Sequence, residues 1–197
     1  MSAEHRKTVF LVRHAQSEQN IATARLERGD VTALVDIVGL GLDAPVSAAG
    51  QQQLEAAAQQ LEGFAEARGI EVVVHSPYQR AVATAQALFS KHPKPLLLLP
   101  PLHERTLTEW MFPWIFDARI QRVRAWLNAR EERVIALVGH GQFFKRCLDA
   151  PSVQPNVSII ETTYSSTEGF VPFPGKRAFE GFPEPAADGS AVPSSRV

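Results

Sequence analysis

Four residues of types suited to phosphate chemistry occupy corresponding places in three short segments of the chain. Arg13-His14, Arg80 and His140 each come just after a short run of apolar, β-forming residues. The planar guanidinium group of arginine matches phosphate oxygens with a fork of donors, and a neutral imidazole carries a lone pair that can attack phosphorus. These residue types predict a site that binds and transfers a phosphate group.

Strands and helices are expected to alternate along the chain and thereby to position these residues. Short apolar runs predict strands at 8–12, 71–75, 96–99, 133–138 and 157–163. Helical spacing, Ser or Pro start signals and terminal glycines predict helices at 18–28, 47–67, 76–89, 117–130 and 141–150. Such alternation requires crossover connections, so the predicted fold is a three-layer α/β/α sandwich with a largely parallel central sheet.

The carboxyl ends of parallel strands meet at one edge of a sheet, where α/β proteins bind their ligands, so the four residues are expected to converge there. Ser76-Pro77 predicts an N-cap and a first-turn proline, which places Arg80 one turn into a helix. Glycine on both sides of His140 allows close backbone approach, and the N–H of Gly141 at a helix start suits an anion.

Composition limits the classes of protein and partner that are expected. A chain of 197 residues with 45% hydrophobic content can form one well-buried domain, predicted at 1–170, ahead of a tail at 171–197 rich in Pro, Gly, Ser and Ala. A net charge of −1 with intermixed signs predicts no nucleic-acid or membrane partner. The single cysteine, Cys147, excludes an internal disulfide, and with no apolar leader at the N-terminus it favours a cytoplasmic location. The oligomeric state is open, a homodimer included.

Four motifs together resemble those of the histidine phosphatase superfamily, the phosphoglycerate-mutase-like proteins. They are RHAQSEQN at 13–20, LDAPVSAAGQQQ at 42–53, SPYQRAVATA at 76–85 and LVGHG at 137–141, in the family's order. The resemblance extends from about residue 8 to about residue 165. Ala15 stands where the family usually has glycine, and Gln19 stands where tryptophan is common.

The resemblance implies a phosphoglycerate-mutase-like fold and assigns a role to each matching residue. It implies that His14 is transiently phosphorylated, and that the phosphoryl group is surrounded by Arg13, Asn20, Arg80 and His140. The arginines are expected to disfavour a proton on His14, whereas a bound phosphate dianion would favour a protonated His140. The two histidines should titrate as a coupled pair, which predicts a bell-shaped pH profile.

The proton donor for the leaving group has two candidates. The resemblance favours Glu104 in the segment LHER, and Glu109 lies close enough in sequence to compete. A carboxylic acid in a partly desolvated cleft can hold a proton near neutral pH and later deprotonate water. The arginines supply positive charge, and the sequence shows no cluster of Asp and His at ligand spacing, so neither a metal nor another cofactor is expected.

The expected function is hydrolysis of a small phosphate monoester through a phosphohistidine. Only 35 residues separate Glu104 from His140, and residues 106–110 depart from the pattern of the mutases, which disfavours a phosphoglycerate mutase. A weakly catalytic phosphate-binding scaffold is the other alternative, motivated by Ala15.

Substrate specificity is expected to lie in the predicted loop 29–45 and in the segment 106–116. Residues 110–116 include two tryptophans and two phenylalanines. They are interpreted as core or cap packing, with the mouth of the pocket as the alternative if they are exposed.

Overall fold

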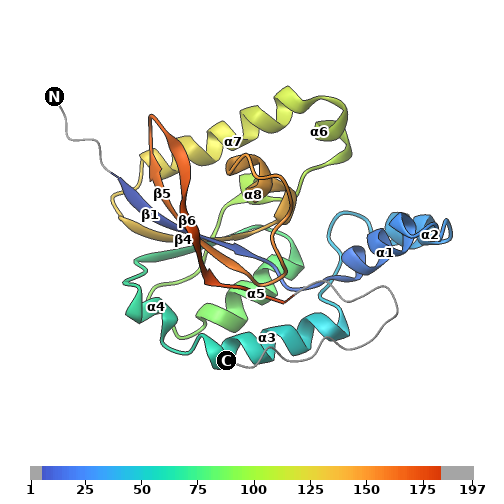
Figure 1. Ribbon diagram of the computed structural model, residues 1–197, viewed down its shortest axis with the longest axis horizontal. Helices are drawn as coiled ribbons and strands as arrows, with labels where there is room; N and C mark the ends of the chain where they lie inside the picture. The colour runs from blue at the N-terminus through green and yellow to red at the C-terminus, as the bar shows by residue number, and fades with distance from the viewer. Residues whose placement is uncertain (1–5, 183–197) are drawn as a thin grey trace.

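A six-stranded sheet forms the centre of the molecule (Figure 1). The computed structural model describes residues 6–182, apart from the side chains of residues 173–176. The strands stand in the order β3-β2-β4-β1-β5-β6. Their bounds are β1 (Lys7–Arg13), β2 (Val72–His75), β3 (Leu97–Leu98), β4 (Val134–Gly139), β5 (Ile159–Ser165) and β6 (Gly169–Phe179).

The pairing of the strands confirms a largely parallel sheet with an antiparallel edge. β1 pairs in parallel with β4, which pairs in parallel with β2, and β2 pairs in parallel with β3. On the other side of β1, strand β5 runs antiparallel to it, and β6 runs antiparallel to β5. The three strand ends predicted to carry the site, those of β1, β2 and β4, are therefore neighbours.

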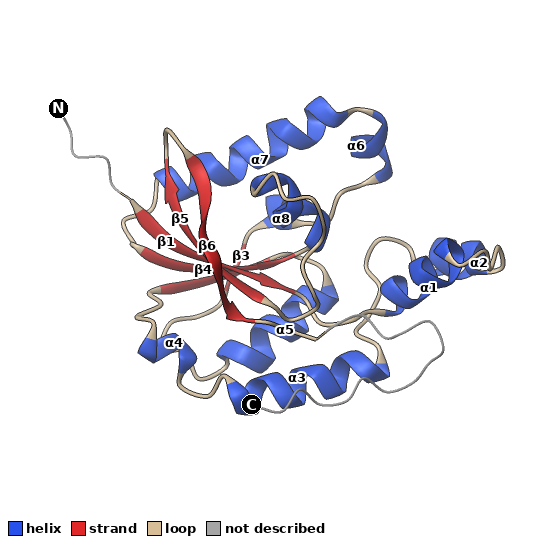
Figure 2. Ribbon diagram, in the orientation of Figure 1, coloured by secondary structure: helices blue, strands red, loops and turns tan. Residues whose placement is uncertain are grey.

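Helices cover both faces of the sheet, as predicted for three layers (Figure 2). One face carries α3 (Ala48–Gln60), α4 (Phe64–Ala67) and α5 (Gln79–Phe89). The other face carries α7 (Pro113–Asn128) and α8 (Gly141–Cys147). Three further helices, α1 (Glu18–Glu27), α2 (Ala33–Leu40) and α6 (Leu107–Met111), lie toward one side of the molecule (Figure 1). A short 3-10 turn, η1, spans Pro100–Leu102.

The core divides at the sheet, because successive side chains of a strand point to opposite faces. In β1, Leu11 joins the cluster that includes Phe116 of α7 and Phe143 of α8, whereas Phe10 joins the cluster that includes Phe89 of α5. All five side chains are buried. Burial of each contributes roughly 1.5–3 kcal/mol, so β1 is held firmly from both sides. Cys147 of α8 is also buried.

The helices differ from the sequence-based expectation in the segments 29–45 and 47–67. Helix α2 lies within 29–45, which was predicted as a loop because of its Gly, Asp and Pro residues. Helices α3 and α4 replace the single helix predicted at 47–67. The helix is interrupted before α4, where Gly63 has a left-handed φ of 72°. Within residues 6–182, no helix is both long and apolar enough to cross a bilayer.

Strand β6 corrects the predicted start of the C-terminal tail. The tail was expected from residue 171, but residues 171–179 belong to this strand. The strand is rich in Pro and Gly, which led to the prediction of a tail. It can form because it lies at the edge of the sheet, where a strand without a complete set of N–H donors is tolerated. The remainder of the predicted tail, residues 183–197, lies outside the described residues.

Candidate active site

A cavity of about 350 Å³ opens at the carboxyl ends of β1 and β4. Its inner part is lined by Arg13, His14, Arg80, Glu104 and Gly141. These residues come from four separate stretches of the chain, and the parallel strand order brings them together. The structure thus collects at one place most of the residues that the sequence singled out.

His14 follows the last residue of β1 and presents one nitrogen to the cavity. Its Nδ1 lies 2.6 Å from the carbonyl oxygen of Ala15, and its Nε2 accepts a hydrogen bond of 3.3 Å from Nε of Arg80. A carbonyl only accepts, so Nδ1 carries the proton and the lone pair is on Nε2. Burial lowers the pKa of His14 well below its usual value, and the charges of Arg80 and Arg13 lower it further. The imidazole is therefore neutral at pH 7.

Arg80 is fixed on the side away from His14 by the segment that follows α2. Its Nη1 donates to the carbonyl oxygen of Leu42 at 3.0 Å, and Asp43 Oδ1 accepts a 2.6 Å hydrogen bond from the N–H of Gln79. Helix α5 begins at Gln79 and not at the predicted Ser76, so Arg80 is the second residue of the helix. Asp43 thus satisfies an N–H at the helix start that Ser76 was expected to satisfy.

Arg13, the last residue of β1, reaches past the start of α8. Its Nη1 donates to the carbonyl oxygen of Gln154. A side chain on Gly141 would overlap Val153 Cγ1, and its Cβ would come within 3.1 Å of Arg13 Nε. Glycine at 141 is therefore needed for this close approach, as expected from the two glycines beside His140.

His140 is not among the residues that line the cavity, but its ring centroid lies 5.0 Å from that of His14. Its Nε2 lies 2.7 Å from Oγ of Ser76, and its buried Nδ1 has no hydrogen-bond partner among residues 6–182. Burial lowers the pKa of His140 well below its usual value, with further lowering from His14 and Arg80. Without an anion His140 is thus neutral, and its expected protonation requires a bound phosphate.

Ser76 is a site residue that the sequence-based interpretation missed. It was assigned to a helix cap, whereas its hydroxyl contacts His140 and accepts from the N–H of Tyr78. Its position directly after β2, facing the end of β4, was the available signal, because β2 and β4 are neighbours in the sheet.

The two candidate proton donors occupy different environments. Glu104 lies at the cavity, partly buried, where its two oxygens accept from the backbone N–H groups of Arg105 at 2.8 Å and Gln142 at 3.4 Å. Burial raises the pKa of Glu104, and the hydrogen bonds and nearby arginines only partly offset this rise. A carboxyl group of this kind can carry a proton closer to neutral pH.

Glu109, in contrast, is held in an ion pair behind the cavity wall. Its carboxylate receives Nε and Nη2 of Arg119 at 2.6 Å and 2.7 Å, and both side chains are buried. Burial favours protonation of Glu109, but the hydrogen bonds from Arg119 and Thr106 outweigh it and hold the pKa below its usual value. Glu109 does not line the cavity, and its capping box with Thr106 begins α6.

Asn20 lines the cavity, but its carboxamide has a structural partner. Its Oδ1 accepts from the backbone N–H and the hydroxyl of Ser17, each at 3.0 Å. Its own backbone N–H donates to Ser17 Oγ at 3.3 Å, which completes the capping box of α1. The amide oxygen is thus occupied, and the NH₂ group is the part of Asn20 suited to a phosphate oxygen.

His14, Glu104 and His140 also form a group whose ligand atoms lie within 4.8 Å of one another. Sequence spacing did not reveal this group, because its members come from three different segments. Two histidines and one carboxylate are ligands that zinc accepts. The adjacent guanidinium groups of Arg13 and Arg80, however, repel a divalent cation and attract an anion.

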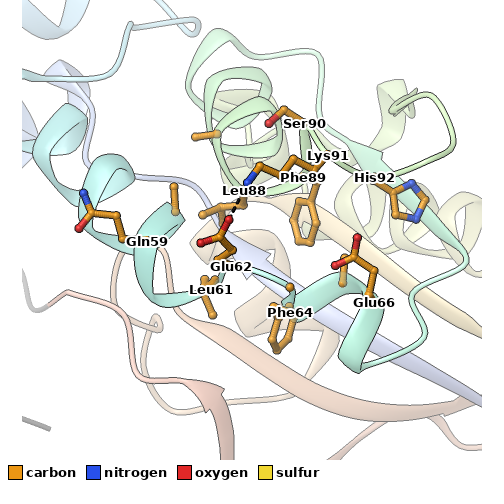
Figure 3. Close-up of a pocket in the computed structure, with 14 residues that line it drawn as sticks. Gln59, Leu61, Glu62, Phe64, Glu66, Leu88, Phe89, Ser90, Lys91 and His92 are labelled. Atoms are coloured by element: carbon orange, nitrogen blue, oxygen red, sulfur yellow. Dashed lines mark hydrogen bonds and ion pairs between the residues drawn. The ribbon is translucent and has the colours of Figure 1, made fainter.

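A second cavity, of about 360 Å³, lies between the ends of α3 and α5 and shares no lining residue with the first (Figure 3). It contains the exposed ion pair of Glu62 and Lys91, 2.6 Å apart. Both ring nitrogens of His92 contact backbone carbonyl groups. Glu62, Lys91 and His92 are therefore engaged with each other or with the backbone. Glu66 is the remaining titratable residue of the lining, and the four groups offer no arrangement comparable to the histidine pair.

Solved structures of low sequence identity share the fold. A mycobacterial glucosyl-3-phosphoglycerate phosphatase in complex with VO₃ has a TM-score of 0.55 at 20% identity, over 79% of this chain and 92% of that chain. The α-ribazole phosphatase of Shigella flexneri has a TM-score of 0.58 at 16% identity, over 84% of this chain and 94% of that chain.

Sequence comparison is more specific than the likeness of fold. The mannitol-1-phosphatase of Eimeria tenella is 45% identical over 64 residues, which cover 31% of this chain and 21% of that protein. The match thus spans about a fifth of the relative's length. A sequence model of the histidine phosphatase superfamily (branch 1) matches residues 9–114, more than half of the chain. The chain therefore belongs to the histidine phosphatase superfamily.

Proposed function

We propose that the chain is a metal-independent phosphomonoester hydrolase with His14 as its nucleophile. The observation that carries the proposal is the lone pair of His14 Nε2, held beside Nε of Arg80 at the floor of a cavity that also contains Arg13 and Glu104. A neutral nucleophile, two fixed cations and a protonatable carboxyl group are the groups that phosphoryl transfer requires. The three relatives described above are named as phosphatases, which supports the same reaction class.

In the first step, Nε2 of His14 attacks phosphorus and the bond from phosphorus to the ester oxygen breaks. Glu104 donates its proton to that oxygen, so the product leaves as a neutral alcohol. The hydrogen bond from Nδ1 to the Ala15 carbonyl holds the ring in the reactive tautomer and stabilises the positive charge that the ring gains. Arg13 and Arg80 stabilise the charge on the transferring phosphoryl oxygens.

In the second step, the phosphohistidine is hydrolysed. The carboxylate of Glu104 removes a proton from water, the water oxygen attacks phosphorus, and the bond from phosphorus to Nε2 breaks. Inorganic phosphate leaves, and both His14 and Glu104 regain their starting forms. His140, protonated when an anion is bound, stabilises the phosphoryl oxygens in both steps together with Asn20 and the N–H of Gly141.

The experiment is hydrolysis of para-nitrophenyl phosphate and mannitol 1-phosphate in EDTA by the parent chain, His14→Ala and His92→Ala. The second ester is included because of the name of the Eimeria relative. His92 is the matched control, since it lies in the second cavity. We expect turnover that survives EDTA, persists in His92→Ala and falls by at least about 10⁴-fold in His14→Ala.

Other outcomes would favour the alternatives. Loss of turnover in EDTA and its recovery with Zn²⁺ would favour a metal held by His14, Glu104 and His140. Interconversion of 2- and 3-phosphoglycerate without release of phosphate would favour a mutase. Binding of phosphate by a folded protein that hydrolyses no ester would favour the scaffold.

A further inference from the structure

The outer part of the active-site cavity is lined by polar side chains that have no role in the folded chain itself. Helix α1 contributes Gln19, Thr23 and Glu27, and the start of α8 contributes Gln142. No side-chain hydrogen bond or ion pair of these four is found among residues 6–182. Gln19, Thr23 and Glu27 follow one another at four-residue intervals, so they lie along one face of α1. Their donors and acceptors are available to a ligand.

The chemistry of this face matches hydroxyl groups. A hydroxyl group both donates and accepts, and an amide, a hydroxyl and a carboxylate together can satisfy several of them. Ala24, Trp110 and Val153 add apolar surface to the same cavity. A carbon chain that bears a hydroxyl on each carbon presents both kinds of surface, and it suits these walls better than an alkyl chain does.

Among the described residues, the outer part holds one cation, whose Nε and Nη2 are directed at the protein backbone, and one carboxylate without a cation partner. Arg105, its only lining cation, lies 3.8 Å from the centroid of the Trp110 ring, and its Nε and Nη2 donate to the carbonyl oxygen of Glu109. Glu27, in contrast, has no cation partner in the described part of the chain. A leaving group that carried a carboxylate would meet this unpaired negative charge.

From these contacts we propose that the leaving group of the substrate is small, uncharged and polyhydroxylated, and that Glu27 and Thr23 determine this specificity. The inference rests on the proposed phosphomonoesterase activity and specifies its substrate class. A cavity of about 350 Å³ has room for the phosphate and a polyol of about six carbons. Glu27 accepts hydroxyl groups and rejects carboxylates, and Thr23 contributes a hydroxyl in the middle of the same face.

The test compares kcat/KM for three esters in EDTA: mannitol 1-phosphate, 3-phosphoglycerate and para-nitrophenyl phosphate. The parent chain should prefer mannitol 1-phosphate over 3-phosphoglycerate by at least about tenfold.

Two variants test the residues proposed to determine this specificity. Glu27→Gln keeps a hydrogen-bonding group and removes the charge, so the preference for mannitol 1-phosphate over 3-phosphoglycerate should fall about fivefold. Thr23→Val keeps the shape and removes the hydroxyl, so kcat/KM for mannitol 1-phosphate should fall about fivefold relative to the aryl ester. Gln59→Ala, in the second cavity, should leave all three values unchanged.

The outcomes separate this inference from the proposed function. Hydrolysis of the aryl ester that depends on His14, with equal or better use of 3-phosphoglycerate, would overturn the inference and leave the phosphatase standing. An unchanged preference in both Glu27→Gln and Thr23→Val would also overturn it. Absence of turnover of every ester would overturn both.

Discussion

The inner and outer parts of the active-site cavity are built in different ways. Arg13 is the last residue of β1, His14 and His140 directly follow β1 and β4, and Arg80 is fixed by the carbonyl of Leu42. The outer wall instead comes from α1, where Ala22 is the one buried residue and Thr23 and Glu27 are exposed. The sheet thus fixes the groups proposed for the chemistry, whereas an exposed helix presents the groups proposed for substrate selection.

This difference predicts that substitutions in the inner part reduce turnover of every ester, whereas substitutions in the outer part change the choice among esters. Arg80 and Arg105 make the largest contrast. Arg80→Ala should lower kcat/KM by about 10³-fold for all esters, because a charge fixed at the phosphoryl group is lost. Arg105→Ala should change kcat/KM by less than about tenfold, because this guanidinium group lies in the outer part. Steady-state kinetics on two esters would measure both, and equal losses would remove the distinction.

Glu104 and Glu109 provide a second contrast, between turnover and stability. Glu104→Gln should lower kcat/KM, which reports the steps up to release of the alcohol, by about 10²-fold for an alkyl phosphate. The loss should be much smaller for para-nitrophenyl phosphate, whose leaving group needs no proton. Glu109→Gln should leave kcat largely unchanged but lower the free energy of unfolding by about 3 kcal/mol, because Arg119 then keeps a buried charge without its partner. Urea unfolding and kinetics with both esters would check this. Loss of kcat in folded Glu109→Gln at normal stability would reverse the assignment.

The pH dependence of kcat/KM for an alkyl phosphate should be bell-shaped with an acidic optimum. The first step needs Glu104 protonated, so activity should fall about tenfold per pH unit above its raised pKa. It also needs His14 neutral, and because its pKa is lowered well below 6.5, the acid limb should appear only well below that pH. Glu104→Gln should lose the alkaline limb and keep the acid limb. A flat profile from pH 4 to 9 would contradict both roles.

Asp43 should act on catalysis through Arg80. Asp43→Ala removes the acceptor for the N–H of Gln79 at the start of α5, so kcat/KM should fall about fivefold as Arg80 loses its fixed position. Asp43→Asn, which keeps an acceptor oxygen, should recover most of the loss. In an Arg80→Ala background, Asp43→Ala should have no further effect on kcat/KM. Additive losses in the double variant would show that Asp43 acts independently of Arg80.

The same contrast explains how much could be predicted from the sequence. Arg13, His14 and His140 could be predicted to converge because each directly follows a strand, and the order of parallel strands determines which ends are neighbours. Ser76 was misassigned because Ser-Pro is also a typical helix start. Its contact with His140 depends on the pairing of β2 with β4, which lie about sixty residues apart.

The lining of the outer part could not be predicted, although its helix α1 agrees with the helix predicted at 18–28. Specificity was expected in 29–45 and 106–116, but among the described residues that line the cavity, none comes from 29–45 and one, Trp110, comes from 106–116. Helix α2 lies in a segment rich in turn-forming residues. This segment is held against α1 by ion pairs from Arg25 to Asp30 at 2.7 Å and to Asp36 at 2.5 Å. The sequence likewise could not decide whether Glu104 or Glu109 is the proton donor. What distinguishes their environments is Arg119, which lies on α7 and approaches Glu109 only when that helix packs beside the cavity.

The apolar segment 110–116 also shows this limit. It was interpreted as core or cap packing, with the mouth of the pocket as the alternative. Phe116 is indeed buried, whereas Trp110 is 52% exposed and Trp114 is 65% exposed. Trp110 lines the cavity, so the alternative holds for this residue.

The central claim is that the phosphoryl group passes through His14, and trapping of the phosphoenzyme tests it most directly. The parent chain would be mixed with a phosphate monoester in EDTA, quenched in alkali within one turnover, and mapped by mass spectrometry of its peptides. We expect an alkali-stable, acid-labile phosphate on the peptide that contains His14, formed as fast as the alcohol is released and absent from His14→Ala. Steady turnover without a phosphoenzyme, or phosphate on a peptide that contains His140 instead, would contradict it.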